Sequence, residues 1–255
     1  MNDLGVGGRA RLRRAHEHRV DQQPALVLHS YPWRETSLIV EAFTRDHGRL
    51  ALVARGAKRP TSQFRGLLTP FSPLLLSWSG RHEIKSLVRV EWCGGLPPLR
   101  GSALFAGFYL NELLVRLLAR ADPHERLFAR YVETLGALAR PEREPEAALR
   151  AFELDLLRET GHAPAFDQCA DGAVVDAGAT YRLDPQRGLV RVEGLPGDDD
   201  ALLLPGRSAL AIARGDFAAP EAAADCKRVL RYLIRYHLNG QPLNTRRILN
   251  DLHRL

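Results

Sequence analysis

The sequence predicts an α+β protein in which a small N-terminal β-barrel is followed by a mostly α-helical domain. Three observations support this class. Short apolar runs separated by turn residues occupy residues 24–93, the pair Pro97-Pro98 punctuates the chain, and the apolar period then lengthens from two residues to about 3.6. The chain has 255 residues, of which 45% are hydrophobic and 26% charged, and this ordinary globular composition excludes a mostly disordered chain.

The predicted barrel has five strands. The apolar runs lie at residues 25–29, 37–43, 50–54, 74–78 and 86–92. Short strands this close together favour closure into a barrel, because closure removes exposed strand edges. A five-stranded oligonucleotide-binding (OB) barrel is the commonest solution, and an SH3-like barrel has the same signature. We place the OB-type domain at residues 23–96, after a basic arm at residues 1–22 that we expect to be disordered.

The remaining chain, residues 97–255, is predicted to be a helical domain with one insert. Apolar residues at helical spacing predict helices near residues 102–119, 123–139, 145–160, 205–215, 220–239 and 244–253. Asp122 is expected to cap the second helix, with Pro123 in its first turn. Residues 164–200 lack a helical period and are rich in Gly, Asp and Pro, so we expect an irregular or β-hairpin insert there with strands near 181–183 and 189–192.

The charges are strongly segregated along the chain. Residues 1–100 carry 16 Lys and Arg against 8 Asp and Glu, residues 101–225 carry 13 against 21, and residues 226–255 carry 7 against 1. Two basic ends that flank an acidic middle favour a polyanionic partner, most often nucleic acid. The alternative is a scatter of charge that only serves solubility.

The basic segment 55–66 is the most informative stretch for function. It lies between two predicted strands and combines glycines, hydroxyl side chains and one aromatic ring with the cations Arg55, Lys58, Arg59 and Arg65. Glycine allows the backbone to approach phosphates, and Phe64 is a candidate to stack on a base. The alternative is a solvated loop in which Phe64 plugs the end of the barrel.

Aromatic residues follow the first predicted strand. Tyr31 and Trp33 come just before Arg34, and rings of this kind can stack on bases without reading sequence. Packing in the core or at the rim of the barrel is the competing interpretation for each ring.

The predicted helix near the C-terminus is amphipathic, with one apolar and one basic side. Lys227, Arg231 and Arg235 recur at i, i+4 and i+8, with Arg228 beside them, and Arg246 and Arg247 follow on the next short helix. Like charges at this spacing repel one another weakly, and a bound anion such as a phosphate or an acidic peptide would relieve the repulsion. A solvated helix face is the alternative.

No metal site, cofactor or catalytic motif is predicted. The three cysteines, Cys93, Cys169 and Cys226, are far apart and form neither a CxxC pair nor a disulfide framework, which suits a reducing cytosol. Walker, GxSxG, HExxH and GxGxxG patterns are absent from the sequence, and the basic barrel lacks the paired carboxylates that a nuclease needs. The sequence also lacks an export signal and a membrane span, so we expect a cytoplasmic, nucleoid-associated protein that is not an enzyme.

Four segments of the sequence resemble the RecO family of DNA recombination mediators. They are residues 25–37 (ALVLHSYPWRETS), residues 43–50 (FTRDHGRL), the basic segment with its continuation to residue 71, and residues 231–238 (RYLIRYHL). The resemblance implies an OB barrel followed by a helical domain. It also implies binding of single- and double-stranded DNA, annealing of complementary strands, and action with RecR to help RecA replace single-strand-binding protein (SSB).

Some members of the RecO family carry a four-cysteine zinc site in the helical domain. Residues 161–172 resemble the approach to that site, but only Cys169 remains, so we expect packing rather than zinc to hold the insert.

These observations lead to two hypotheses about binding residues. First, Arg34, Arg49, Arg55, Lys58, Arg59 and Arg65 form a cationic track for DNA phosphates, with Tyr31, Trp33 and Phe64 as stacking candidates. Second, the basic C-terminal helices, with Lys227, Arg228, Arg231, Arg235, Arg246 and Arg247, bind the acidic, aromatic-ended tail of SSB, or DNA. An RNA- or ribosome-binding OB module is the main alternative function, and a metal-dependent nuclease is a second.

Overall fold

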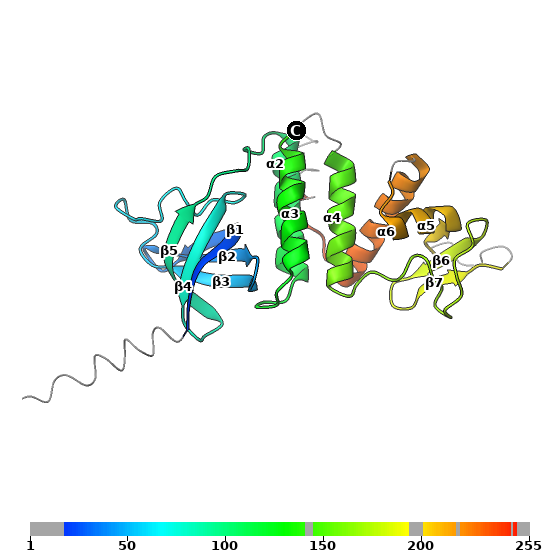
Figure 1. Ribbon diagram of the computed structural model, residues 1–255, viewed down its shortest axis with the longest axis horizontal. Helices are drawn as coiled ribbons and strands as arrows, with labels where there is room; N and C mark the ends of the chain where they lie inside the picture. The colour runs from blue at the N-terminus through cyan, green and yellow to red at the C-terminus, as the bar shows by residue number, and fades with distance from the viewer. Residues whose placement is uncertain (1–17, 141–144, 194–200, 218–219, 246, 249–255) are drawn as a thin grey trace, which may run out of the picture. The chain divides into compact units, whose positions relative to one another are not determined.

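The computed structural model describes residues 18–140, 145–193, 201–217, 220–245 and 247–248. The chain divides into two compact units at residue 139 (Figure 1). The first unit contains a β-barrel and two helices, and the second contains three helices and a small sheet. The unit that holds the barrel therefore extends beyond residue 96, where the sequence placed the end of the OB-type domain.

The first unit contains the predicted five-stranded barrel. Its strands are β1 (Arg19–Trp33), β2 (Ser37–Thr44), β3 (Gly48–Ala54), β4 (Pro73–Ser79) and β5 (Ile84–Trp92). They close in the order β1-β2-β3-β5-β4, with β3 and β5 parallel and the other neighbours antiparallel. This is the OB-type arrangement rather than the SH3-like one. β1 begins inside the predicted arm, and residues 1–17 of that arm lie outside the described residues.

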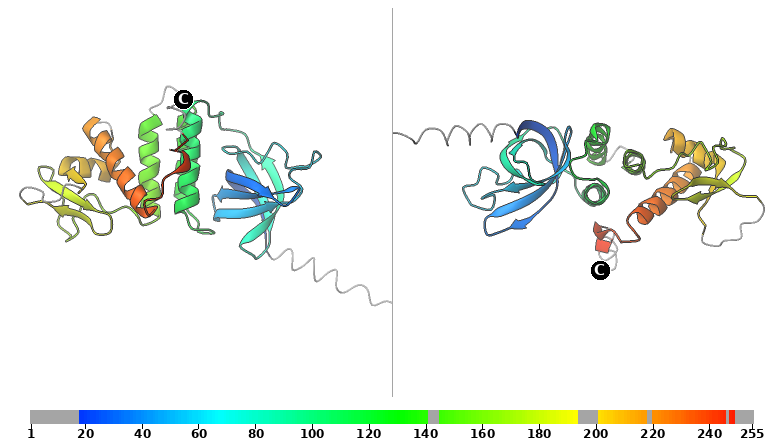
Figure 2. Two further views of the ribbon diagram at one scale, coloured as in Figure 1. Left: turned by 180° about the vertical axis from the view of Figure 1, so that it is seen from behind. Right: turned by 90° about the horizontal axis from the view of Figure 1, so that it is seen from below.

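Successive side chains along each strand point alternately into the barrel and away from it, so each strand has an inner and an outer face. Val27, Val40, Leu52 and Trp78 belong to the buried cluster that fills the barrel. β2 is buried on both faces because the helices α2 (Ser102–Leu117) and α3 (Glu125–Leu138) cover part of the outer one. The right-hand view of Figure 2 shows these two helices side by side next to the barrel. The continuous apolar run of β2 in the sequence therefore reflects two packed faces.

A β-bulge in β1 joins the barrel to the helices through a buried polar contact. The β1–β2 register shifts between Val27 and His29, which leaves Leu28 without a partner on β2. Its carbonyl accepts a hydrogen bond of 2.8 Å from Asn111 Nδ2 on α2. Tyr131 on α3 donates its hydroxyl to Asn111 Oδ1. Complete burial raises the pKa of the Tyr131 hydroxyl well above its ordinary value, which keeps the hydroxyl a donor.

Replacing Asn111 by alanine is expected to lower the free energy of unfolding by about 1–3 kcal/mol. The Leu28 carbonyl would remain buried without a donor, and burial of an unpaired polar group is costly. Tyr131→Phe removes only the hydroxyl and should cost about 1 kcal/mol. Urea unfolding measures both values, and an Asn111→Ala variant as stable as the parent would contradict this role.

The start of α3 differs from the sequence prediction. The helix begins at Glu125 with His124 at the N-cap position, so the expected cap at Asp122 is wrong. The backbone at Asp122 lies against the β2–β3 turn, where a Cβ added to Gly48 would come within 1.9 Å of the Asp122 carbonyl oxygen. The Ala121 amide donates to the carbonyl of Arg49. These contacts hold the segment against the barrel and delay the helix.

The second unit contains α4 (Pro145–Glu159), the strands β6 (Thr180–Asp184), β7 (Gly188–Arg191) and β8 (Leu203–Pro205), and the helices α5 (Gly206–Arg214) and α6 (Pro220–His237). The predicted hairpin in the insert is confirmed as β6 and β7. β8 pairs with the other side of β6 and was not predicted. A last helix was predicted at residues 244–253. Residues 244, 245, 247 and 248 are helical, and residues 246 and 249–253 lie outside the described residues.

Candidate nucleic-acid interface

Two loops meet at one end of the barrel. The turn from β1 to β2 comprises residues 34–36, and the long connection from β3 to β4 begins with the basic segment. The Lys58 amide donates a 2.9 Å hydrogen bond to the Thr36 carbonyl and so ties the loops together. Gly56 adopts a φ of 69°, which lets the chain turn away from β3. The loops enclose an open hollow of about 740 Å³ that is lined by Trp33, Arg34, Glu35, Thr36, Ser37, Val53, Arg55, Gly56 and Arg59.

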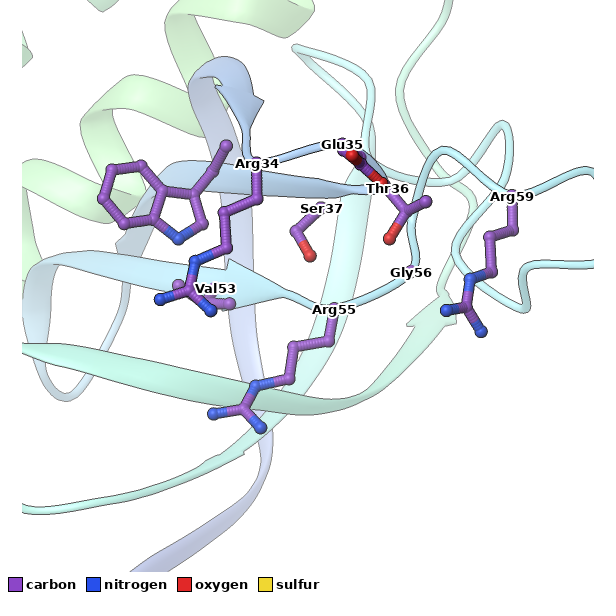
Figure 3. Close-up of a pocket in the computed structure, with 9 residues that line it drawn as sticks. Arg34, Glu35, Thr36, Ser37, Val53, Arg55, Gly56 and Arg59 are labelled. Atoms are coloured by element: carbon purple, nitrogen blue, oxygen red, sulfur yellow. The ribbon is translucent and has the colours of Figure 1, made fainter.

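The hollow gathers three of the predicted DNA-binding cations. Arg34 comes from the β1–β2 turn, whereas Arg55 and Arg59 come from the β3–β4 loop. Figure 3 shows that their three guanidinium groups extend toward the same side. All three side chains are exposed, and none of them forms an ion pair with an acidic residue in the described part of the chain. Such a concentration of unneutralised cations attracts a polyanion.

Lys58 and Arg65 extend the positive charge along the same loop. Both residues are exposed, and Arg65 Nη1 donates to the Pro60 carbonyl of its own loop. Hydrogen bonds between nearby backbone groups run from residue 56 to residue 67 and give the loop a compact form. Five of the six cations of the predicted track thus lie on these two loops, three of them around the hollow. We name Arg34, Arg55, Lys58, Arg59 and Arg65 the barrel-end cations.

Arg49 is separated from the barrel-end cations. Its Nη1 lies 2.8 Å from Glu41 Oε2, and its Nε and Nη2 both donate to the Leu118 carbonyl. Arg120 also donates to Glu41. The Arg49 side chain is only 12% exposed, and its charge is neutralised by Glu41 within the first unit. We therefore do not include Arg49 in the interface.

Replacing Arg49 by alanine is therefore expected to leave DNA affinity within about twofold of the parent value. The reason is that the guanidinium already binds Glu41 and the Leu118 carbonyl and has little exposed surface for a phosphate. Fluorescence anisotropy with a labelled single strand measures the effect. If Arg49→Ala lowered DNA affinity as much as Arg55→Ala does, the prediction would be wrong and Arg49 would belong to the DNA interface.

The three aromatic candidates fall into two groups. Phe64 is 6% exposed and belongs to the cluster inside the barrel, so it plugs the barrel end and is not available to stack on a base. Tyr31 and Trp33 are 37% and 43% exposed. The guanidinium carbon of Arg34 lies 6.0 Å from the Trp33 ring centroid, within cation–π range.

The basic C-terminal residues lie in the second unit. α6 buries Val229, Leu230, Leu233 and Ile234, as its apolar pattern predicts. Arg231, Arg235 and Arg247 are exposed. Lys227 is paired with Glu146, and Arg228 is paired with Asp225. Arg246 lies outside the described residues.

A hollow of about 640 Å³ lies where α4 and α6 begin. It is lined by Pro145, Glu146, Ala147, Arg150, Phe217, Pro220, Ala223, Ala224 and Lys227. The pKa of Glu146 is lowered, first because Lys227 donates a hydrogen bond to it and further because Arg150 and Arg231 are close. The hollow thus combines apolar walls with the ion pair of Lys227 and Glu146.

The surroundings of Cys169 do not fit a zinc site. A structural zinc needs about four Cys or His ligands, and no group of three or more His, Cys, Asp or Glu side chains with metal-binding geometry occurs in the described part of the chain. The insert is instead packed around the buried residues Phe166, Tyr181, Leu183 and Leu189.

No helix among the described residues is both long and apolar enough to cross a membrane.

The closed barrel, with its strand order and its cationic end, identifies the first unit as an OB fold. In OB-fold proteins the strands and the loops that connect them commonly form the ligand-binding surface. Comparison with known proteins places the chain within this class. Residues 19–96 match the model for the N-terminal part of recombination protein O, and residues 99–247 match the model for its C-terminal part. The chain belongs to the RecO family of recombinational DNA repair proteins, as its sequence motifs indicated.

Relatives cover nearly the whole chain. The DNA repair protein RecO of Ralstonia nicotianae is 55% identical over 241 residues, which are 94% of this chain and 87% of the relative. The RecO proteins of Polynucleobacter asymbioticus and Aromatoleum aromaticum are each 51% identical, over 93% and 94% of this chain and 98% and 100% of their own lengths. Members of this family are recombination mediators and not enzymes.

Proposed function

We propose that this chain is a recombination mediator that binds single- and double-stranded DNA at the barrel-end cations. The observation that carries the proposal is the hollow lined by Arg34, Arg55 and Arg59, whose cations have no acidic partner among the described residues. Exposed guanidinium groups bind phosphate oxygens well and carry no base-specific information by doing so. The interface is therefore suited to DNA of any sequence.

Annealing of complementary strands follows from the same charge. Two strands repel each other through their phosphates, and a protein that neutralises phosphates on both lowers this repulsion. In the cell the substrate is a single strand covered by SSB, and we propose that the chain acts there with RecR so that RecA can replace SSB. This role places the chain upstream of strand exchange.

An annealing assay tests the proposed function. Complementary strands, each coated with SSB and carrying one dye of a fluorescence pair, are mixed with and without the protein. Faster pairing with the parent protein than with an Arg55→Ala/Lys58→Ala/Arg59→Ala variant supports the proposal. Absence of any acceleration would overturn it, and a preference for folded RNA over single-stranded DNA in competition would favour the RNA-binding alternative.

We further propose that the hollow between α4 and α6 receives the acidic, aromatic-ended tail of SSB. Phe217 and the neighbouring alanines supply apolar walls. Lys227, which is 38% exposed and paired with Glu146, is the lining cation that a peptide carboxylate reaches by displacing Glu146. The Arg150 side chain is 9% exposed and its Nη1 lies 2.8 Å from Glu153 Oε2, so Arg150 forms part of the wall of the hollow. A buried anchor with charge around it is a common way to bind a short peptide.

A tail peptide tests this docking. Fluorescence anisotropy should show binding to the parent protein and an approximately tenfold or greater loss for Lys227→Glu and for Arg231→Glu. Arg207→Glu on α5 introduces the same charge change at an exposed site outside the hollow and is the matched control. Equal binding by all four proteins would exclude this hollow as the tail site.

A further inference from the structure

The outer face of β1 carries three aromatic side chains in a row. His29, Tyr31 and Trp33 occupy alternate positions, which place their side chains on one face of the strand. The register with β2 is regular from His29 to Trp33, so the bulge at Leu28 does not interrupt the row. All three residues are exposed. Tyr31 and Trp33 are recognisable as stacking candidates in the sequence, whereas His29 is not, because a single histidine at the end of an apolar run carries little signal.

His29 and Tyr31 are farther apart than two rings in direct contact. The ring centroids of His29 and Tyr31 are 6.1 Å apart with an interplanar angle of 29°. Two rings in direct stacking contact are about 3.4–4 Å apart, whereas alternate residues on a strand lie about 6.6 Å apart. A base inserted between two rings needs about 6.8 Å between their planes, so the His29 and Tyr31 side chains must rotate slightly apart to accept one. Bases of a duplex are held in base pairs, so only an unpaired base can turn outward and enter the row.

The row leads directly to the barrel-end cations. Trp33 lines the same hollow as Arg55 and Arg59, and Arg34 lies over its ring. Arg34 has a φ of 54° in the tight turn, a conformation that non-glycine residues seldom adopt. A strand whose bases enter the aromatic row therefore has its phosphates within reach of the cations.

We propose that His29, Tyr31 and Trp33 form an aromatic ladder that intercalates unpaired bases and makes this interface prefer single-stranded over double-stranded DNA. This inference rests on the proposed function, because it assumes that the barrel-end cations bind the DNA backbone. The ladder adds to DNA affinity a contribution that requires bases but does not depend on their sequence, since every base has a face that can stack.

Two oligonucleotides of equal length test the ladder. One is oligo(dT) and the other has the same backbone with abasic sites in place of every base. The parent protein should bind oligo(dT) more tightly, and Tyr31→Ala should weaken oligo(dT) binding by about 5- to 30-fold while leaving abasic binding unchanged. His29→Ala and Trp33→Ala should act in the same direction, and Tyr31→Phe should retain the parent affinity because it keeps the ring.

Controls separate the ladder from the cations and from folding. Tyr236→Ala removes an equally exposed tyrosine from α6 and should leave both affinities unchanged. Thermal unfolding confirms that each variant is folded. Equal parent affinity for oligo(dT) and the abasic strand would overturn the ladder but not the proposed function, whereas failure to bind either strand would overturn both.

Discussion

Replacing Arg55, Lys58 and Arg59 together by alanine is expected to lower affinity for a single strand on the order of 100-fold at low salt. The estimate assigns about 1 kcal/mol to each exposed phosphate contact. All three side chains are exposed on one loop and have no acidic partner in the described regions, so their removal costs the protein little internal stabilisation. The logarithmic dependence of affinity on salt should also become shallower by about 0.7 for each lost contact.

The matched control removes the same charge elsewhere. Arg126, Arg207 and Arg214 are exposed on α3 and α5, away from the barrel-end loops in the chain. An Arg126→Ala/Arg207→Ala/Arg214→Ala variant should lose far less affinity, since only the long-range field changes. Comparable losses in the two triple variants would show that net charge, rather than the barrel end, determines DNA binding.

The second large effect concerns stability. Glu41→Ala is expected to lower the free energy of unfolding by about 3–5 kcal/mol, because removal of one member of a buried ion pair leaves the other uncompensated. Glu41 is 6% exposed at its side chain, and both Arg49 and Arg120 bind its carboxylate. The cluster ties β2 and β3 to the segment that follows α2, through the bonds from Arg49 to the Leu118 carbonyl.

Glu83→Ala is the control for this cluster. Glu83 also pairs with Arg120, but its side chain is 71% exposed, so its loss should cost no more than about 1 kcal/mol. Urea unfolding of both variants gives the comparison. Similar values for Glu41→Ala and Glu83→Ala would contradict the importance assigned to burial.

Sequence patterns predicted the barrel well because turn residues separate its short apolar runs, including the run of β2 that is buried on both faces. The helices of the second unit were also found, since α6 buries the apolar positions that its period indicates. Helix boundaries that are set by tertiary contacts were harder to predict from the sequence. Asp122 has the chemistry of an N-cap, yet its backbone is held against Gly48, and no local pattern reveals that contact.

The candidate site was predicted in part. The basic segment stood out because its cations, glycines and hydroxyls are adjacent in sequence, and the structure places two of its cations, Arg55 and Arg59, around one hollow with Arg34. Arg49 and Phe64 have suitable chemistry for DNA, but one is paired with Glu41 and the other is buried in the barrel. Sequence alone cannot distinguish a cation facing solvent from one facing a buried carboxylate on a neighbouring strand.

β8 shows a different limit of sequence reasoning. Its three residues, Leu203–Pro205, are too few for an alternating pattern, and they become a strand only because β6 offers a free edge. His29 was also not predicted at the interface. It becomes a candidate only because its ring lies next to the Tyr31 ring on the same face of β1.

A salt titration of DNA affinity tests the central claim most directly. With five barrel-end cations in contact with phosphates, a plot of log affinity against log salt should have a slope of roughly −3 to −5 for oligo(dT), and a similar slope for a mixed sequence. A slope near zero would contradict the account, because it would mean that no phosphate is neutralised on binding.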